Sequence, residues 1–427
     1  MPIFLIHFAQ RHTAFRFPEL ASAAKSLEIP FTLISPHSDS SPFLLIEIPS
    51  AEKASLLAKK CTLIKSVGEL IARSSQGIPD LASRSIAAAK ESRLQTYKLN
   101  YSSHGLQKCK SIEDQVQIYS HFFPLPFFQG AKVELDDAKV QAKFCIHEDF
   151  TAPEYAAYFS KWLSEGARSE IHRLSLKTRP YIGTTSMDAE LSLIMANMGC
   201  SRPGALVMDP FAGTGSLLLA CSAAGAYTFG GEIDGRQLRG GASFDKTQRP
   251  LYEAPPAGRG QFKITKKASV DWETNVVHYG LSKLVLDALV SDISQSPLRP
   301  IGILDAIVTD PPYGVRAGTK KTALHCSTEG YHIDSIILDL LNFAAGMLKT
   351  GGRLVYWLPV PTGAGVPETE TPLHPSLRVL WESEQLCGGW SRRLVTMEKV
   401  RDYILLEPCA EPGLTFREKI IKGNFQE

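Results

Sequence analysis

The chain has 427 residues, of which 44% are hydrophobic and 21% are charged, and its formal net charge at pH 7 is only +2. This length can supply two or three hydrophobic cores, and the near-neutral charge means that nucleic-acid binding would have to come from local basic patches. The eight cysteines form no CxxC pair, which argues against a disulfide framework or a zinc site and favours a reducing compartment. Because no segment is apolar over a bilayer's width and the start lacks a signal-peptide layout, we expect a cytoplasmic protein of more than one domain with no membrane segment.

The first half of the chain, residues 1–175, is predicted to be an α+β region. Short strands are expected at Ile3–Phe8, Phe31–Ile34, Phe43–Glu47, Cys61–Val67 and Lys139–Ile146. Amphipathic helices are expected at Pro18–Leu27, Ala51–Ala58, Leu81–Tyr97 and Tyr155–Leu163. The cations scattered through this half are interpreted mainly as solvated faces, with a nucleic-acid groove as the alternative.

The second half, residues 176–427, alternates predicted strands with predicted helices. The strands are Leu206–Asp209, Thr228–Glu232, Leu284–Val290, Leu304–Thr309 and Arg353–Pro359, and a closing hairpin is expected from Leu377–Glu382 and Leu394–Lys399. The helices are Met187–Met198, Leu217–Ala224 and Asp334–Leu348. Such alternation predicts an α/β domain with a parallel, doubly wound sheet whose ligand site lies at the carboxyl ends of the strands.

Four acidic residues are predicted to end strands of this sheet, namely Asp209, Glu232, Asp292 and Asp310. Because the carboxyl ends of parallel strands meet at one edge, we expect the four side chains to converge there. A charged residue that ends a buried strand usually has a task. We therefore interpret the acids as parts of one ligand site, and the chain shows no pattern of metal ligands.

A glycine-rich loop, DPFAGTGS at residues 209–216, follows the first of these strands. Its glycines permit a tight turn and a close approach to a ligand, and the next strand ends in Glu232, where an acid can bind the two hydroxyls of a ribose. A dinucleotide fits poorly because Asp209 would repel its pyrophosphate. S-adenosylmethionine has a ribose, an adenine, an ammonium and a sulfonium but no phosphate, and it is the cofactor we expect.

Roles within the cofactor site follow from this interpretation. Asp209 and the glycine-rich loop would hold the methionine part, Glu232 the ribose hydroxyls, and Asp292 the adenine amino group, although Asp292 could instead cap a helix. Asp234 is a second candidate for the ribose or a cap. The predicted cofactor-binding residues are Thr185, Asp209, Pro210, Phe211, Gly213, Gly215, Glu232 and Asp292.

The run Asp310, Pro311, Pro312, Tyr313 ends the fourth strand and is the predicted catalytic group. The carboxylate and a proline carbonyl can accept hydrogen bonds from the two N–H groups of an exocyclic amine while Tyr313 stacks on the planar base. Methyl transfer needs alignment and a nitrogen lone pair, and these two acceptors would free the lone pair from the ring and stabilise the developing positive charge. Tyr313 is thus also predicted to bind substrate, and Arg316 would contact a phosphate or form an exposed ion pair.

An insertion at residues 236–267, between the second and third strands, is rich in Gly and Pro and strongly basic. Its cations are Arg236, Arg239, Lys246, Arg249, Arg259, Lys263, Lys266 and Lys267. A basic loop beside the predicted pocket suits a polyanionic substrate, and a surface insertion without a ligand is the alternative.

DPFAGTGS, GGEID and DPPYG, in that order, resemble the amino-methyltransferase class of Rossmann-like enzymes that use S-adenosylmethionine. The segments RPYIGTTSMDAELSLIMANM, DPFAGTGSLLLA, DPPYGVRAG and WSRRLVTMEK together resemble the tRNA guanosine-N2-methyltransferases that act on the guanosine at tRNA position 10. The match covers most of the second half, whereas in the first half only FRFPEL at residues 15–20 and the α+β layout are similar. Ala317 departs from the family pattern, which often has an acid after the arginine of DPPYGxR.

This resemblance implies a Rossmann-like methyltransferase domain preceded by a THUMP-containing region that grips the acceptor end of tRNA. It also implies a partner, since eukaryotic members work with a small zinc-binding activator subunit in a heterodimer. Two alternatives stay open from the residues themselves. A DNA adenine-N6 or cytosine-N4 methyltransferase would use the same DPPY chemistry, and a catalytically dead RNA-binding scaffold would keep the fold alone.

Overall fold

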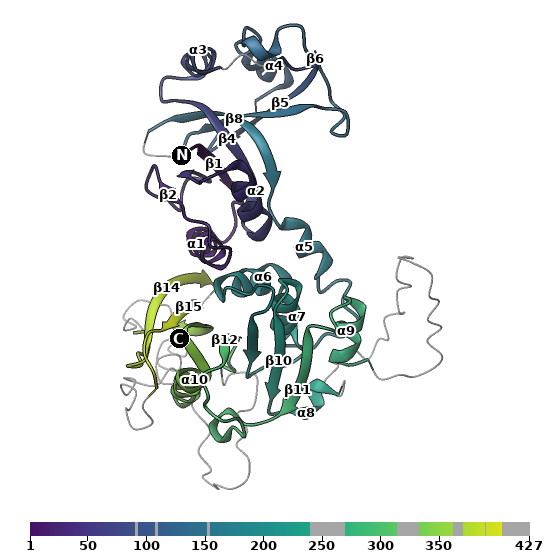
Figure 1. The fold of residues 1–427 in the computed structure, drawn as a ribbon, viewed down its shortest axis with the longest axis vertical. Coiled ribbons are helices and arrows are strands. Elements are labelled where there is room, and N and C mark those ends of the chain that lie inside the picture. The colour runs from purple at the N-terminus through teal and green to yellow at the C-terminus, as the bar shows by residue number, and fades with distance from the viewer. Residues whose placement is uncertain are drawn as a thin grey trace, which may run out of the picture. The chain divides into compact units, whose positions relative to one another are not determined.

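The computed structural model describes residues 1–89, 93–106, 110–151, 154–239, 270–313, 333–361, 370–388 and 390–403 (Figure 1). By its internal contacts the chain divides into two compact units, Met1–Glu170 and Ile171–Glu427. Among the described residues, no helix has both the length and the apolar character needed to cross a membrane.

The first unit is built on an eight-stranded sheet with the strand order β2-β3-β1-β4-β8-β7-β5-β6. The strands are β1 (Ile3–Phe8), β2 (Thr32–Leu33), β3 (Phe43–Glu47), β4 (Ile64–Ser74), β5 (Thr96–His104), β6 (Lys132–Val133), β7 (Ala142–Asp149) and β8 (Ala156–Glu165). The helices are η1 (Thr13–Phe15), α1 (Arg16–Ser26), α2 (Ala51–Lys60), α3 (Ile78–Ala88), α4 (Ile112–Ser120) and η2 (Pro126–Phe128). This mixture confirms the expected α+β class of the first half.

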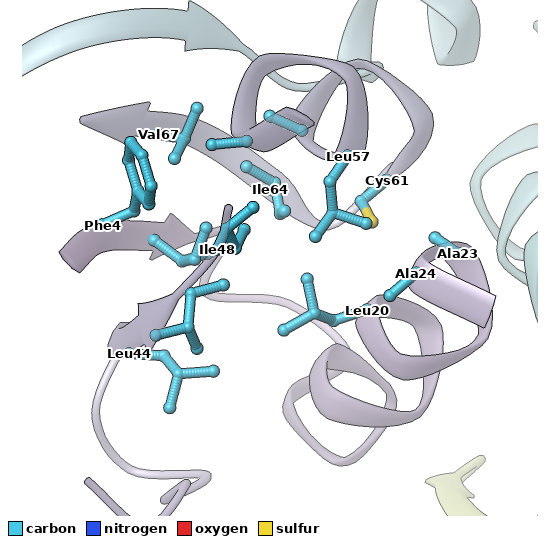
Figure 2. Packing of buried hydrophobic residues seen from close by; sticks show 14 of the residues in the cluster. Phe4, Leu20, Ala23, Ala24, Leu44, Ile48, Leu57, Cys61, Ile64 and Val67 are labelled. Atoms are coloured by element: carbon cyan, nitrogen blue, oxygen red, sulfur yellow. The ribbon is translucent and has the colours of Figure 1, made fainter. Parts of the chain in front are cut away.

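A hydrophobic core joins α1 and α2 to the strands at one end of this sheet. Figure 2 shows Leu20 of α1 and Leu57 of α2 gathered with Phe4, Leu44 and Ile64 of β1, β3 and β4. All five side chains are almost completely buried. β1 and β3 form where the sequence predicts them, and alternate residues of each strand face this core, while residues between them, such as Leu5 and Leu45, belong to a separate buried cluster.

Two helices predicted for the first half are wrong. The helix expected at Leu81–Tyr97 ends at Ala88 as α3, and β5 begins at Thr96. The helix expected at Tyr155–Leu163 is instead strand β8, which pairs antiparallel with β4 on one side and with β7 on the other. Over a short run, a sequence such as AAYFSKWL fits both the helical and the strand periodicity of apolar residues. Pairing with two neighbouring strands therefore decides that the segment is a strand.

The second unit holds a seven-stranded sheet with the order β11-β10-β9-β12-β13-β15-β14. The strands are β9 (Leu206–Asp209), β10 (Tyr227–Glu232), β11 (Val285–Val290), β12 (Leu304–Thr309), β13 (Leu348–Pro361), β14 (Leu377–Leu386) and β15 (Trp390–Lys399). The helices are α5 (Arg168–Arg173), which straddles the division between the units, α6 (Ala189–Met198), α7 (Ser216–Ala223), α8 (Gly235–Leu238), α9 (Trp272–His278), η3 (Ile293–Gln295) and α10 (Ile333–Met347).

The pairing in this sheet confirms the predicted doubly wound, Rossmann-like arrangement. β9 pairs in parallel with β10 and with β12, so the chain winds outward in both directions from β9. β13 continues the parallel part, and β15 joins it antiparallel as half of the predicted closing hairpin with β14. The carboxyl end of β9 is therefore the switch point of the sheet, which is where such folds bind ligands.

Helices cover both faces of the sheet beside this point. Tyr356 of β13 packs in a core with Leu340 and Leu341 of α10, whereas the next residue, Trp357, donates its indole N–H to the sulfur of Met195 on α6 at 3.1 Å. Because neighbouring residues of a strand point to opposite faces, α10 and α6 cover opposite sides. α6 begins two residues later than predicted, since Asp188 caps it by accepting a hydrogen bond from the N–H of Glu190.

Candidate active site

The four acids expected at strand ends do lie along one edge of the second sheet. Asp209 and Glu232 are the last residues of β9 and β10. Asp310 comes directly after β12, and Asp292 is the second residue after β11. The parallel registers pair Asp209 with Gly230, and Glu232 with Val290, so these strand ends lie at neighbouring positions. The edge therefore carries a concentration of negative charge where the fold places its ligand.

The glycine-rich loop folds back onto the carboxylates that flank it. Asp209 uses one oxygen, Oδ1, to accept hydrogen bonds from the hydroxyl of Thr309 at 2.6 Å and from the N–H of Phe211 at 3.0 Å. Glu232 accepts from the N–H of Gly213 at 2.8 Å. Gly213 and Gly215 have φ angles of 52° and 82°, which L side chains rarely adopt, so this turn depends on glycine.

Burial raises the pKa values of Asp209, Glu232 and Asp310 at this edge. The pKa of Asp209 is raised to about 7, chiefly because its carboxyl is buried and in part because Glu232 and Asp310 are close. Burial likewise raises the pKa of Glu232. A bound cation would favour the ionised forms of both groups, so the site is electrostatically suited to a positively charged ligand.

The segment 179–186 is tied against the glycine-rich loop. Asn275 of α9 bonds both the N–H and the C=O of Tyr181, at 2.9 and 2.8 Å. Further along, the hydroxyl of Ser186 bonds that of Thr214 at 2.6 Å. These ties bring Thr185 next to Gly213, where its hydroxyl oxygen lies 3.8 Å from the point that a Cβ would occupy. Thr185, predicted from sequence as a cofactor contact, therefore borders the same loop.

Asp292 and Asp234 both act as caps in the structure. One oxygen of Asp292 accepts from the N–H and the hydroxyl of Ser294, at 2.9 and 2.8 Å, and begins the short helix η3. Asp234 caps α8 through the N–H of Arg236 and forms an ion pair with its guanidinium at 2.6 Å. Capping was the alternative left open for each residue, and a cap at this edge does not prevent a second contact to a ligand.

Asp310 and Tyr313 contact each other at the end of β12. The hydroxyl of Tyr313 donates to Oδ1 of Asp310 at 2.5 Å. Burial raises the pKa of Asp310, while the bonds from Tyr313 and the charge of Arg392 act in the opposite direction. Pro311 is buried and Pro312 is half-buried, so the two prolines fix the backbone between the carboxylate and the ring.

Two functional candidates were missed by the motif analysis, Trp390 and Arg392. The ring of Trp390 meets that of Tyr313 edge to face with centroids 5.8 Å apart, and a guanidinium nitrogen of Arg392 lies 3.9 Å from Oδ2 of Asp310. Both lie at the start of strand β15, which runs antiparallel to β13 and so begins at the carboxyl edge of the parallel strands. The predicted closing hairpin indicates an antiparallel strand here, but that strand is expected to begin only at Leu394, so the prediction places neither residue at this edge.

Some predicted features lie outside the described residues. Arg316 and Ala317 fall in the segment 314–332, and the insertion 236–267 is described only as far as Arg239. Their expected roles therefore stay predictions.

Comparison with known proteins covers both units. Residues 2–168 match the Tmrp11 THUMP N-terminal domain, and residues 177–327 match the RMKL-like methyltransferase domain. The tRNA (guanine(10)-N(2))-methyltransferase TRMT11 of Homo sapiens is 36% identical over 433 residues, which cover 94% of this chain and 89% of the human protein. The tRNA (guanine(10)-N(2))-methyltransferase of Schizosaccharomyces pombe is 32% identical over 461 residues, covering 94% of this chain and 90% of that protein.

Among solved structures, TrmN from Thermus thermophilus is similar with a TM-score of 0.46 and 17% identity, covering 93% of this chain and 100% of that chain. The sequence identity to the human and yeast proteins extends over nearly the whole chain and includes both units. The chain therefore belongs to the family of tRNA (guanine(10)-N(2))-methyltransferases.

Proposed function

We propose that this protein transfers the methyl group of S-adenosylmethionine to the exocyclic N2 amine of the guanosine at position 10 of tRNA, giving N2-methylguanosine. The observation that carries the proposal is the position of Asp310, Pro311, Pro312 and Tyr313, which follow β12 directly beside the strand that ends in Asp209. The residues that would hold the substrate amine and the site for a cationic cofactor thus share one edge of the sheet.

The residues of the cofactor site fit S-adenosylmethionine. Its ammonium and sulfonium would stabilise ionised Asp209 and Glu232, whose pKa values burial raises in its absence. The donors of the glycine-rich loop suit its carboxylate, and the acid at the end of β10 suits its ribose hydroxyls. Asp292 would reach the adenine amino group with the oxygen that does not cap η3. When bound, the cofactor supplies an activated methyl group.

The chain's own residues would prepare the acceptor amine. Asp310 and a carbonyl of Pro311 or Pro312 accept one hydrogen bond each from the two N–H groups of the amine. This geometry turns the nitrogen lone pair out of conjugation with the ring. Tyr313 now bonds Asp310, so on arrival of the base the carboxylate exchanges the phenol hydroxyl for the amine, and the Tyr313 ring stacks on guanine. The proton released from the nitrogen passes to Asp310 or to water.

The first unit and a partner complete the proposed assembly. We assign tRNA binding to the N-terminal region, residues 1–175, and catalysis to residues 176–427, and we propose that the basic residues of the insertion 236–267 contribute to tRNA binding. Residues 2–168 match a THUMP N-terminal domain, which supports an RNA-binding role for the first region. We further propose a small zinc-binding activator subunit as partner and the cytoplasm as the place of action.

To test the proposal, the full chain is incubated with labelled S-adenosylmethionine and either unmodified tRNA or duplex DNA. Each reaction is run with and without a candidate activator subunit. Digestion of the products should reveal labelled N2-methylguanosine at position 10 of tRNA only. Label in DNA adenine or cytosine would overturn the proposal in favour of a DNA amino-methyltransferase. Cofactor and tRNA binding without any label, even with the activator, would identify a non-catalytic scaffold.

A further inference from the structure

Arg392 lies on β15, beyond the parallel strands of the sheet, yet it reaches the edge that carries Asp310. It lies opposite Pro359 of β13 and Gln385 of β14, near the start of the antiparallel strand β15. Because β15 runs against β13, its first residues stand level with the carboxyl ends of the parallel strands. A cation is thereby brought to the edge that carries the four acids, and the proposed mechanism above does not use it.

The guanidinium of Arg392 is held by two fixed partners. It stacks over the ring of Trp357, with its central carbon 4.0 Å from the ring centroid, and Trp357 is completely buried. Its Nε donates to the side-chain oxygen of Gln385 at 2.8 Å. A planar group that is stacked on one face and bonded at Nε has little rotational freedom left, so the direction of its remaining N–H groups is determined.

Those N–H groups face the two residues that meet the substrate. Nη1 lies 3.9 Å from Oδ2 of Asp310 and donates to the hydroxyl of Tyr313 at 3.4 Å. The carboxylate thus has the Tyr313 hydroxyl at one oxygen and the Arg392 charge at the other. Asp310 raises the pKa of Asp209 on the neighbouring strand, so these two carboxylates repel each other. Arg392 is therefore the cationic partner of Asp310 among the described residues around it.

We propose that Arg392 is a positioning residue that keeps Asp310 ionised and holds its carboxylate toward the incoming amine. This inference rests on the proposed methyl transfer, because it concerns how Asp310 serves as acceptor. A neutral Asp310 carboxyl would present a proton where the amine needs an acceptor. Burial favours that neutral form, and the hydrogen bond from Tyr313 and the fixed guanidinium of Arg392 both oppose it.

Arg393 provides a matched control. It is the same residue type at the next position of β15 and therefore points to the opposite face. There its guanidinium faces Glu382 at 3.4 Å and the hydroxyl of Thr371 at 3.3 Å. Replacing Arg393 removes one positive charge and one long side chain from the same strand, without touching Asp310.

The experiment measures single-turnover methylation of tRNA from pH 5 to 9 for the wild type, Arg392→Met, Arg392→Lys and Arg393→Met. Removing an adjacent arginine should raise the carboxyl pKa, so the acid limb of Arg392→Met should move up by about one pH unit or more. Its rate should fall most at low pH and recover toward high pH. Arg392→Lys should restore most of the position of the acid limb, and Arg393→Met should leave it unchanged.

A second measurement reads the same titration without catalysis. The difference in thermal stability between a chain with Asp310 and one with Asp310→Asn depends on pH, with an inflection at the native pKa of Asp310. In the Arg392→Met background this inflection should move upward. An unchanged inflection, or a loss of activity that is equal at every pH, would overturn the role of Arg392. If the inflection moves upward in the Arg392→Met background but the wild-type chain never labels tRNA, the role of Arg392 stands and the proposed function is contradicted.

Discussion

Asp209→Asn is predicted to stabilise the chain without cofactor and to weaken cofactor binding. Both bonds that Asp209 accepts, from Thr309 and Phe211, go to Oδ1, and an asparagine carbonyl oxygen can keep both. The substitution therefore removes the charge while it preserves shape and local contacts. Because the carboxyl of Asp209 is buried, the cost of its charge should dominate the effect.

The magnitude follows from the pKa of Asp209, about 7 in the folded chain against an ordinary value of 3.8. A raised carboxyl pKa favours the protonated folded state, so this contribution to stability is present below pH 4 and is lost as the pH rises to 7. The difference amounts to about 4 kcal/mol, since each pKa unit corresponds to about 1.4 kcal/mol. Between pH 4 and pH 8 the melting temperature of Asp209→Asn should therefore rise relative to wild type by roughly 10 °C.

The assay is thermal unfolding of both proteins across this pH range, with and without S-adenosylmethionine. Asp287→Asn, on the exposed part of β11, gives the baseline for the same chemical change on a solvated side chain. The cofactor should stabilise wild type more than Asp209→Asn, because the charge-assisted contact to its ammonium is lost, at about 1.5–3 kcal/mol. If the melting temperatures of wild type and Asp209→Asn changed with pH in parallel, the raised pKa of Asp209 would be refuted. Equal cofactor affinities of the two proteins would refute the assigned contact.

Three further substitutions separate turnover, cofactor binding and folding. Asp310→Ala should lower the single-turnover rate by about 10³-fold with cofactor and tRNA affinities near wild type, and a matching loss of cofactor affinity would show that Asp310 is misassigned. Glu232→Gln should weaken S-adenosylmethionine by about tenfold or more in calorimetric titration, because a neutral amide is the poorer acceptor for ribose hydroxyls; an unchanged affinity would exclude it from the ribose site. Gly166→Ala should destabilise the first unit by about 3 kcal/mol or prevent its folding, because a Cβ there would lie 1.9 Å from the carbonyl oxygen of Ile64. A wild-type melting temperature for Gly166→Ala would contradict that packing.

The site residues whose positions could be predicted from sequence are those that depend on local order along the chain. Asp209 and Glu232 could be placed because each ends a short apolar strand next to a loop or turn of glycine, and the parallel fold brings such ends together. Asp310 and Tyr313 contact each other across three positions of one motif. In these cases the residues that act together belong to one contiguous segment, so their positions can be predicted without knowing how distant strands pair.

The features that were missed depend on pairing between distant segments. Arg392 lies beside Asp310 only because β15 runs antiparallel to β13, and no local pattern around WSRR specifies that register. The segment Tyr155–Leu163 forms a strand because β4 and β7 accept it on both sides, which outweighs its local preference. Asp292 could not be assigned by motif alone, since a cap and an adenine contact require the same residue type at the same strand end.

The central claim is that Asp310 accepts the N2 amine of a guanosine in tRNA. Its most direct test is to incubate wild type and Asp310→Ala with labelled S-adenosylmethionine and unmodified tRNA, in the presence of the activator candidate, and to map the label by nucleoside. The account predicts N2-methylguanosine at position 10 from wild type and almost none from Asp310→Ala, with both proteins binding the cofactor equally. Label at another base, or equal labelling by Asp310→Ala, would contradict it.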